Sequence, residues 1–462
     1  MVGKILIVDS VATNRIVFKV ALGDAFYLPV FATDGEDCLQ ILRHFSPDLI
    51  LLNLDLPDQS GASLIEKLRM LTPFRDVPIV ALACAHQTSL RLLALKAGAD
   101  DVMDKNGDIQ TLLARIRNLL RGRESIKCLA SGTKETELLG LAEASATFER
   151  PALISLIGSK SQASLQLQQT LPTLITDKVN VQSRENAFLY ANQTNSAEVP
   201  DVFLIEADAT GFGNAFRLMS ELRSMGPTQH SAVCILRHKS SGDSTTLAFD
   251  MGADDVVDVG ATPDEIALRI KVLIRRKREA DLVRASVQDG LRLAVFDPLT
   301  GLHNRRYALP QLASIAENAH EDDTVFGVMI IDLDKFKSVN DRLGHAAGDT
   351  VLVEVARRLV SSLRENDLVA RIGGDEFLVG FSNTNFDEAC SAADRLCRAI
   401  EEQPIAVGIS TSIHVTVSIG LAISSKTAVV EAITDIVERA DLALRIAKAK
   451  GRNQVNISKN AA

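Results

Sequence analysis

One short segment occurs twice in this chain and constrains the fold more than any other feature. Residues 97–104 read AGADDVMD and residues 251–258 read MGADDVVD, and each copy is followed by an amphipathic helical pattern that ends in Arg. Around both copies, short apolar runs alternate with helical segments, the pattern of a parallel sheet flanked by helices. The sequence therefore predicts two related α/β domains in tandem. The strands predicted for the first domain are 4–8, 28–31, 48–52, 78–83 and 101–103.

The chain is long enough for a further domain, because 462 residues with 46% apolar side chains can fill about three cores. A charged segment at 275–295 carries apolar residues at helical spacing and predicts an exposed connecting helix. After it, antiparallel strands around a tight glycine turn, mixed with helices, predict an α+β domain. Its predicted elements are strand 325–331, helix 346–363, a hairpin around 371–380, helix 386–402, strand 414–422 and helix 431–449.

These patterns also give the expected domain boundaries. The segment between the two α/β domains is mixed polar and small, and we interpret it as a helical linker. The expected order is the first α/β domain at 1–122, the linker at 123–150, the second α/β domain at 151–278, the connecting helix at 279–296 and the last domain at 297–462.

Charge and composition exclude several kinds of protein. A net charge of −9 without a basic tail argues against nucleic-acid binding, because affinity for phosphate backbones comes from clustered Lys and Arg. The cysteines at 38, 84, 128, 234, 390 and 397 form no CxxC pair and no zinc site, so we expect reduced thiols. No apolar run reaches the roughly 20 residues of a membrane span. We expect a cytoplasmic protein that neither binds DNA nor inserts into a membrane.

Two pairs of acidic residues distinguish the last domain. Asp332 and Asp334 end an apolar strand, where a divalent ion could be held beside a substrate phosphate. Asp375 and Glu376 follow two glycines, which allow a backbone to approach a phosphate or a base closely. Each pair also has a simpler interpretation, a strand cap for the first and a solvated hairpin tip for the second.

Together with their surroundings, these acids resemble the GGDEF family, the diguanylate cyclases. The resemblance covers residues 297–455, and its many spaced matches make it highly specific. It implies a nucleotidyl-cyclase-like α+β fold and the condensation of two GTP molecules into cyclic di-GMP and pyrophosphate. The matching segments are 297–306 (DPLTGLHNRR), 332–341 (DLDKFKSVND), 344–345 (GH), 348–349 (GD), 371–377 (RIGGDEF), 415–420 (VTVSIG) and 447–453 (AKAKGRN).

The resemblance implies a metal site and a catalytic base. Asp332, the Leu333 carbonyl and Asp375 would bind Mg²⁺, or Mn²⁺ in its place. Glu376 would be a further ligand or the base that helps to activate the 3′-hydroxyl of GTP. The residues that the resemblance assigns to catalysis are Glu376, Asp375 and Lys337.

The same resemblance implies how GTP is bound. Asn340 and Asp349 would hydrogen-bond guanine, whose N1–H and amino edge suits a carboxylate. Lys448 and Arg452 would meet the β- and γ-phosphates, although isolated cations are more often solvated surface charges. The remaining contacts would come from the backbone at Phe336 and Lys337 and from the turn at Gly373 and Gly374.

A few positions of the motif carry no expected contact or depart from it. Asp334, His345 and Gly348 match the family, and we interpret them as structural. Arg445 stands where relatives usually have Tyr, close to the phosphate-binding positions, which leaves a loss of catalysis open.

The resemblance also implies a homodimer and feedback inhibition by the product. Each domain of this family holds one GTP, so two domains must face each other across a two-fold axis. Arg364 and Asp367 form an Arg-x-x-Asp that marks the product-inhibition site in this family, and Arg395 matches a supporting arginine. Arg can grip phosphate or stack on guanine, and Asp can accept from the guanine edge. A helix-end salt bridge is the simpler interpretation of the same residues.

Residues 4–122 resemble a response-regulator receiver. The fold class expected for the whole chain is therefore multidomain α/β, with two CheY-like doubly wound (βα)5 receivers followed by the α+β GGDEF domain. A working receiver needs an acidic pair for Mg²⁺, an Asp nucleophile, a Ser or Thr switch and a Lys. This chain has Asp9 and Ser10 at the pair, Asn53 at the phosphoacceptor, Ala83 at the switch and Lys105. An amide cannot be phosphorylated, and Asp55 should lie in the loop, out of line with the Lys.

The second receiver is expected to be eroded further. Gly158 and Ser159 stand at the acidic pair, and Val259 and Gly260 stand where the Lys is expected. Glu206, at the phosphoacceptor position, could mimic a permanent negative charge or be a solvated strand end, and we favour the second. Neither receiver should accept phosphate. We expect the tandem to act as a scaffold for dimerisation and for docking of a regulatory protein.

Two other functions fit the sequence less well. A catalytically silent effector or scaffold that binds cyclic di-GMP would not need the intact metal and substrate positions. A DNA-binding response regulator would need a helix-turn-helix after residue 276 and a basic surface. The chain has no EAL or HD-GYP segment, so we do not expect it to hydrolyse the dinucleotide.

Overall fold

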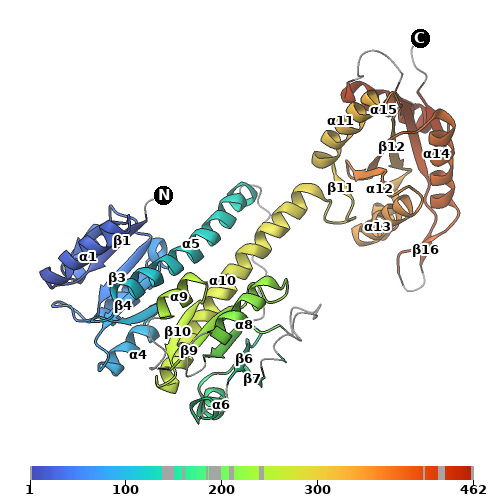
Figure 1. Cartoon of the computed structure of the whole chain (residues 1–462). Helices are drawn as coiled ribbons and strands as arrows, with labels where there is room; N and C mark the ends of the chain where they lie inside the picture. The colour runs from blue at the N-terminus through green and yellow to red at the C-terminus, as the bar shows by residue number, and fades with distance from the viewer. Residues whose placement is uncertain are drawn as a thin grey trace. The chain divides into compact units, whose positions relative to one another are not determined.

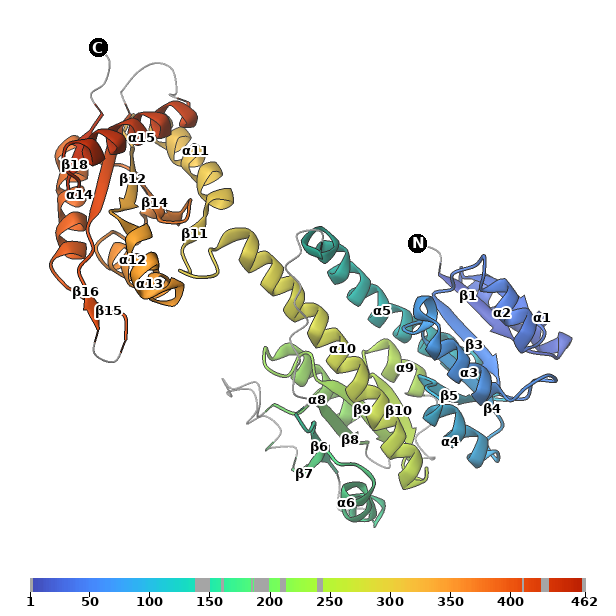
Figure 2. The same cartoon turned by 180° about the vertical axis from the view of Figure 1, so that it is seen from behind.

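The computed structural model divides into two compact units, Met1–Val287 and Gln288–Ala462 (Figure 1, Figure 2). No helix within the described parts of the chain is long and apolar enough to cross a membrane. The structure describes residues 3–137, 150–158, 162–183, 186, 199–207, 213–238, 244–408, 411–424 and 432–458.

The first unit begins with a parallel five-stranded sheet in the order β2-β1-β3-β4-β5, and each strand lies within one residue of its predicted range. Helices α1 and α5 pack on one face, and α2, α3 and α4 pack on the other. The strands are β1 (Lys4–Val8), β2 (Leu28–Ala32), β3 (Leu49–Asn53), β4 (Ile79–Ala83) and β5 (Asp101–Asp104). The helices are α1 (Ala12–Asp24), α2 (Gly35–Ile41), α3 (Gly61–Met70), the 3₁₀ turn η1 (Thr72–Phe74), α4 (Thr88–Lys96) and α5 (Ile109–Glu137).

A second parallel sheet in the same unit, β10-β9-β8-β6-β7, has the same topology as the first. Helices α6 and α10 cover one face, and α8 and α9 cover the other. Both sheets are doubly wound, as predicted. The strands are β6 (Leu153–Ile157), β7 (Lys178–Gln182), β8 (Val202–Glu206), β9 (Ala232–Arg237) and β10 (Asp255–Asp258). The helices are α6 (Gln162–Leu174), α8 (Gly213–Ser224), α9 (Ser244–Asp250) and α10 (Pro263–Val295).

The two predicted connecting segments are parts of longer helices. The helix expected at 279–296 is not a separate element, because α10 begins at Pro263 and continues to Val295. In the linker expected at 123–150, α5 extends to Glu137, and residues 138–149 lie outside the described residues. Both helices start as the last helix of an α/β domain and carry on past it.

The two α/β domains meet through a ring of four buried charges. Arg115 Nε donates to Asp101 Oδ2 at 2.5 Å, and Arg269 Nη1 donates to Asp101 Oδ1 at 2.6 Å. Asp255 completes the ring, 3.5 Å from Arg115 and 3.1 Å from Arg269. Burial raises the pKa of Asp101, but the two arginines outweigh it and hold that pKa below its usual range. The two acids and the two arginines occupy matching places in the repeated segments, so the repeat itself creates a pseudo-symmetric contact.

The second unit contains one mixed six-stranded sheet in the order β11-β13-β14-β12-β17-β18, with helices on both faces (Figure 2). Helices α13 and α14 pack on one face, and α11 and α15 pack on the other. The predicted α+β class and the hairpin β13–β14 are confirmed. The strands are β11 (His303–Asn304), β12 (Gly327–Leu333), β13 (Leu368–Arg371), β14 (Glu376–Phe381), β17 (Val417–Ile423) and β18 (Val455–Ile457), with a separate pair β15 (Ile405–Ala406) and β16 (Ser412–Ile413). The helices are α11 (Arg305–Glu321), α12 (Phe336–Leu343), α13 (His345–Ser361), α14 (Phe386–Glu401) and α15 (Ile433–Ala449).

Candidate active site

Three acidic residues lie near one another where β12 and β14 run side by side in the second unit. Asp332 lies directly opposite Glu376 in the antiparallel register, so the two side chains share one face of the sheet. Asp375 comes just before β14, and its carbonyl accepts a hydrogen bond from Leu333 N at 3.2 Å. The structure therefore brings together the residues that the sequence assigned to a metal.

The electrostatics of Asp332 show how crowded this corner is. Burial raises the pKa of Asp332, and the nearby Asp375 and Glu376 raise it further. The ammonium of Lys448 on α15, with Nζ 2.6 Å from Asp332 Oδ2, works in the opposite direction without cancelling the rise. The pKa of Asp332 is therefore above its usual value, chiefly because the carboxyl is buried and to a lesser extent because two other acids lie nearby. Additional positive charge close to Asp332 would favour the ionised form of its carboxyl.

The donors in this corner suit a hard divalent cation. Across the described ranges, no three His, Cys, Asp or Glu side chains form a group that could hold a metal ion by themselves. Mg²⁺ in nucleotide sites commonly uses one or two protein carboxylates and takes its other ligands from phosphate and water. Asp332, Asp375 and the Leu333 carbonyl, with Glu376 beside them, provide oxygen ligands of this kind. The residues fit a cation that arrives with a triphosphate.

The glycine turn holds Glu376 close to its own backbone. Ile372 N donates to Glu376 O at 2.9 Å, and a Cβ on Gly373 would lie 2.6 Å from Glu376 Oε2. A Cβ on Gly374, in contrast, would meet no atom within 4 Å. Only the first glycine lies against the Glu376 side chain. The second leaves open space beside the acids.

Arg371 fixes the turn to the start of the domain, a role that the sequence did not reveal. Its Nη2 donates to Gly374 O at 2.7 Å and its Nη1 to Asp297 Oδ1 at 3.0 Å. Thr300 N and Oγ1 donate to the same Asp297 oxygen. Burial works to raise the pKa of Asp297, but these hydrogen bonds hold it below its usual range. Asp297 and Arg371 both lie within segments that match the family motif, near strands β11 and β13, which pair with each other. Their opposite charges were the signal in the sequence that could have indicated this ion pair.

The two expected guanine contacts lie on α12 and α13, which pack against each other. A Cβ on Gly348 would overlap with Asn340 Oδ1, so this glycine makes room for the amide. Asn340 Oδ1 is buried and has no hydrogen-bond partner among the described residues, which leaves an acceptor for a ligand. Asp349 follows Gly348 directly and is exposed. The structure places the two expected contacts on either side of one glycine.

The expected phosphate contacts lie near the end of α15. A Cβ on Gly420 would overlap with the backbone of α15, so this glycine allows the helix to lie close on β17. Lys448 is partly exposed and Arg452 is exposed in the loop that follows. Arg445 lies on the exposed surface of α15, where it pairs with Asp441 at 2.7 Å. The departure from the family at this position is therefore on the surface of the helix.

At the start of α12, the two residues expected in the phosphate cradle differ in their surroundings. Phe336 is partly buried and packs against the main core, while Lys337 is exposed. Lys335 just before them has a φ of 58°, which turns the chain from β12 into the helix. The first backbone N–H groups of α12 therefore follow directly after the strand that carries Asp332.

The expected product-inhibition residues form a second polar cluster. Asp367 Oδ2 accepts from Arg364 N at 2.8 Å, and Arg395 donates to Ser362 O at 2.9 Å. Burial raises the pKa of Asp367, and Arg364 and Arg395 only partly offset this rise. The Arg364 guanidinium is exposed and reaches Glu388 at 3.4 Å. The three expected residues are therefore neighbours, and their arginines are accessible to a ligand.

In the first unit, the phosphoacceptor position of the first domain holds a buried amide. Asn53 is 1% exposed, its Oδ1 accepts from Asp55 N at 3.1 Å, and its Nδ2 has no partner among the described residues. Asp9 is fully buried and accepts from Val11 N and Asn14 Nδ2. Asp55 lies beyond the end of β3, as predicted.

In the second domain, the preferred interpretation of Glu206 as a solvated strand end is wrong. Glu206 is only 1% exposed, and its Oε1 lies 3.1 Å from His238 Nε2 just after β9. The strand β8 ends inside the domain rather than at its surface, so the carboxylate needs an internal partner. Gly158 is described at the end of β6, whereas Ser159 lies outside the described residues.

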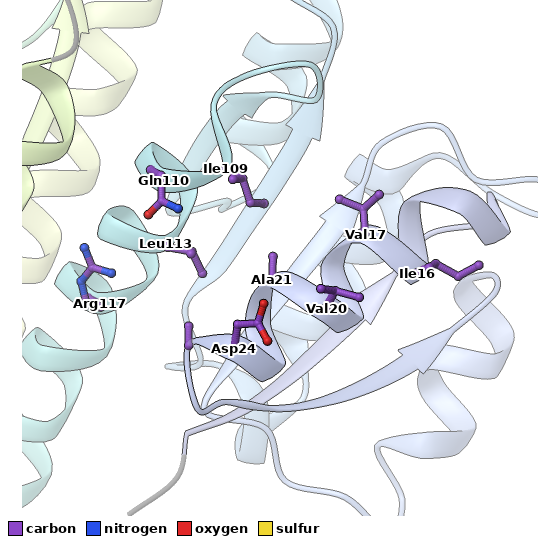
Figure 3. Close-up of a pocket in the computed structure, with 10 residues that line it drawn as sticks. Ile16, Val17, Val20, Ala21, Asp24, Ile109, Gln110, Leu113 and Arg117 are labelled. Carbon is purple, nitrogen blue, oxygen red and sulfur yellow. The ribbon is translucent and has the colours of Figure 1, made fainter.

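A groove of about 690 Å³ lies between α1 and α5 in the first unit (Figure 3). Its lining includes Ile16, Val17 and Val20 on α1 and Ile109 and Leu113 on α5. The three α1 side chains are between 57% and 62% exposed, which is unusual for adjacent aliphatic residues on one helix. None of the predicted catalytic, metal or product-site residues lines this groove.

The chain is similar to known proteins in both units. A family model described as "Diguanylate cyclase, GGDEF domain" matches residues 294–454, and one described as "Response regulator receiver domain" matches residues 5–117. The chain is 30% identical to the response regulator PleD of Caulobacter vibrioides over 98% of this chain and 99% of that protein. It is 40% identical to diguanylate cyclase A of Treponema denticola over 37% of this chain and 46% of that protein. The solved GGDEF domain of DgcB from Caulobacter crescentus, in complex with c-di-GMP, aligns with a TM-score of 0.34 and 29% identity over 36% of this chain and 94% of that chain.

Proposed function

The chain belongs to the GGDEF family of diguanylate cyclases that carry a receiver domain, and we propose that it converts two GTP molecules into cyclic di-GMP and two pyrophosphates on a divalent metal ion. The observation that carries this proposal is the register of β12 and β14. It sets Asp332 opposite Glu376, with Lys448 Nζ 2.6 Å from Asp332. Acids and a lysine gathered in this way suit phosphoryl transfer, in which catalysis is mostly positioning and charge neutralisation.

In the proposed reaction, the 3′-oxygen of one GTP attacks the α-phosphorus of the other and pyrophosphate leaves, once in each direction. Asp332, the Leu333 carbonyl, Asp375 and Glu376 would hold Mg²⁺, or Mn²⁺, which neutralises charge on the phosphates when bound. Glu376 Oε2, held over Gly373, can take the proton of the 3′-hydroxyl. Lys448 and Arg452 at the end of α15 and the backbone at the start of α12 would then hold the leaving pyrophosphate.

Selectivity for guanine would come from the buried acceptor Asn340 Oδ1 and the exposed carboxylate of Asp349. Asn340 Oδ1 has no partner within the described chain, and a bound base would satisfy it. Asp349 can accept from the N1–H and the amino group of guanine, which adenine lacks. The nucleotide preference therefore rests on groups that would stay unpaired with the wrong base.

We infer that the active form is a homodimer, because each domain would bring only one GTP. The exposed aliphatic groove between α1 and α5 supports a second copy of this chain as the partner on that face. Apolar patches of this kind on a folded domain mark protein contacts. The receivers would then serve as a scaffold for dimerisation, and a regulatory protein could dock on them.

Product inhibition would act through the cluster of Arg364, Asp367 and Arg395. The two arginines offer charged donors to phosphate and flat surfaces to guanine. The raised pKa of Asp367 supports a ligand that donates hydrogen bonds to it, since such donors favour the ionised form. Cyclic di-GMP has both phosphates and guanine edges.

We also infer that neither α/β domain of the first unit is switched by phosphorylation. Asn53 is a buried amide, which has no oxygen nucleophile for phosphoryl transfer. Glu206, at the second phosphoacceptor position, is buried in contact with His238 and is therefore not open to a phosphodonor. Activity would then be constitutive or set by partner binding and product.

The proposal is tested by incubating the purified full-length chain with GTP and Mg²⁺ and measuring cyclic di-GMP by mass spectrometry. The Glu376→Gln variant, which keeps the shape of the side chain, should form no product while its circular dichroism is unchanged. If the wild type forms no product and binds cyclic di-GMP tightly, the chain is a silent effector instead.

A further inference from the structure

The loop after α15 has an unusual backbone. Gly451, Arg452 and Asn453 have φ values of 125°, 68° and 46°, three consecutive residues on the left-handed side. Side chains with a Cβ rarely adopt this region, so Arg452 and Asn453 need support from their surroundings. Such local strain, when it persists, is found mainly at functional sites.

The support comes from the carboxylate of Asp334, which is almost buried at 9% exposure. Its Oδ2 accepts from Asn453 N at 3.0 Å and from Thr416 Oγ1 at 2.8 Å. Its Oδ1 accepts from Ser418 Oγ at 2.7 Å. One side chain therefore joins the end of β12, the start of β17 and the left-handed loop.

A carboxylate is the group that this position requires. Three donors, two hydroxyls and one backbone N–H, converge on it, and both of its oxygens accept. An asparagine would offer one acceptor oxygen and would place an N–H₂ group against a donor. The same strand holds Asp332 two residues earlier, so the loop is tied to the strand that carries the expected metal ligand.

We propose that Asp334 is a positioning residue that holds Arg452 in place for the β- and γ-phosphates of the substrate. The inference rests on the proposed function, which makes GTP the ligand of this site. Asp334 itself touches no substrate, because its oxygens are taken by the three donors. It acts through Asn453, the residue next to Arg452, and sets the distance between the phosphate-binding loop and the acids of β12.

The proposal predicts an effect that depends on the phosphates of the ligand. Asn340 and Asp349, expected to bind guanine, lie on α12 and α13, and neither makes a hydrogen bond to Asp334 in the described structure. A loosened loop should therefore weaken the binding of the triphosphate and leave the binding of the guanine and ribose unchanged. A general collapse of the site would weaken both.

The test measures the affinity of the full-length chain for two ligands in Mg²⁺ by calorimetry. One is 3′-deoxy-GTP, which lacks the attacking hydroxyl, and the other is GMP. Asp334→Asn should weaken the binding of 3′-deoxy-GTP about 5- to 30-fold, less than the complete loss of a charged contact would, and change the binding of GMP by less than about twofold. In a double-mutant cycle with Arg452→Ala, the two effects should not add, because both act on the same contact.

Asp394→Asn is the matched control, since it removes the same charge from an exposed position on α14 and should change neither affinity. If Asp334→Asn does not fold, Thr416→Val, which removes one donor to the same oxygen, should show the same selectivity at a smaller size. Equal weakening of both ligands, no weakening of either, or additive effects in the cycle would overturn the proposal. A wild type that fails to bind 3′-deoxy-GTP would instead refute the proposed function.

Discussion

Lys448 Nζ lies 2.6 Å from Asp332 Oδ2, so a residue expected to bind phosphate shares a contact with a residue expected to bind metal. Burial and the neighbouring acids raise the pKa of Asp332, and the lysine opposes them. A divalent cation bound to Asp332 would compete with Lys448 for this oxygen and release the ammonium towards the phosphates. On the proposed function, metal and nucleotide binding would then be coupled through one carboxylate.

Lys448→Met should separate these two roles. Without its ammonium, the affinity for Mn²⁺ in the absence of nucleotide should rise several-fold, while the KM for GTP should rise about tenfold or more. Spin-resonance titration gives the first quantity and steady-state turnover the second. Arg445→Ala, on the exposed surface of the same helix, is the control and should change neither. A loss of affinity for both Mn²⁺ and GTP would contradict the competition.

Arg364→Ala should relieve inhibition by the product without lowering the initial rate. The loss of a charged hydrogen-bond donor typically costs about 1.5–3 kcal/mol, so the inhibition constant for cyclic di-GMP should rise roughly 10- to 100-fold. Initial rates measured at increasing concentrations of added product give this constant. Unchanged inhibition would contradict a role of Arg364 in binding the product. Its contact with Glu388 would then be a surface ion pair only.

Acetyl phosphate should have no effect on this protein. Asn53 provides no acceptor, and Asp55 lies past the end of β3. Mass spectrometry of the treated chain should show no phosphoryl group, and the rate of product formation should stay the same. A phosphorylated Asp55 would refute this account of the first domain.

The buried ring between the two α/β domains should contribute far more to stability than an exposed ion pair nearby. Arg269→Met leaves two buried acids with one arginine, so the opening free energy of β5 and β10 should fall by about 3–5 kcal/mol. Hydrogen exchange of the full-length chain measures it. Arg117→Met is the control, because Arg117 and Asp250 are each 40% exposed, and its loss should cost about 1 kcal/mol or less. Similar losses in the two variants would show that the ring is not a closed, desolvated unit.

Much of the fold could be predicted from local patterns. The strands of the first sheet lie within one residue of their predicted ranges, because fully buried parallel strands appear as continuous apolar runs. Helices α11 and α12 were not predicted, since α11 contains Pro310 and α12 is only eight residues long. The length of α10 was also missed, because the apolar pattern changes where the helix leaves its domain while the backbone remains helical.

In the candidate site, too, the sequence revealed individual residues but not the contacts between segments that are far apart in the chain. Asp332, Asp375 and Glu376 could be found as acids at the ends of apolar segments, and the structure brings them together. The contacts of Asp334 with Thr416, Ser418 and Asn453 could not, because they join segments more than 80 residues apart. Glu206 was misjudged for a related reason: a charged residue at a strand end looks solvated until a partner such as His238 is known. Local patterns identify donors and acceptors, and only the fold pairs them.

The most direct test of the central claim is the rate of GTP turnover per mole of protein as a function of protein concentration. In the proposed mechanism two domains with one GTP each meet for every turnover, so this specific rate should rise with concentration and reach a plateau. Val20→Asp, which places a charge in the apolar groove on α1, should shift the rise to higher concentration. A specific rate that is constant down to concentrations where the protein is monomeric, or no cyclic di-GMP at any concentration, would contradict the account.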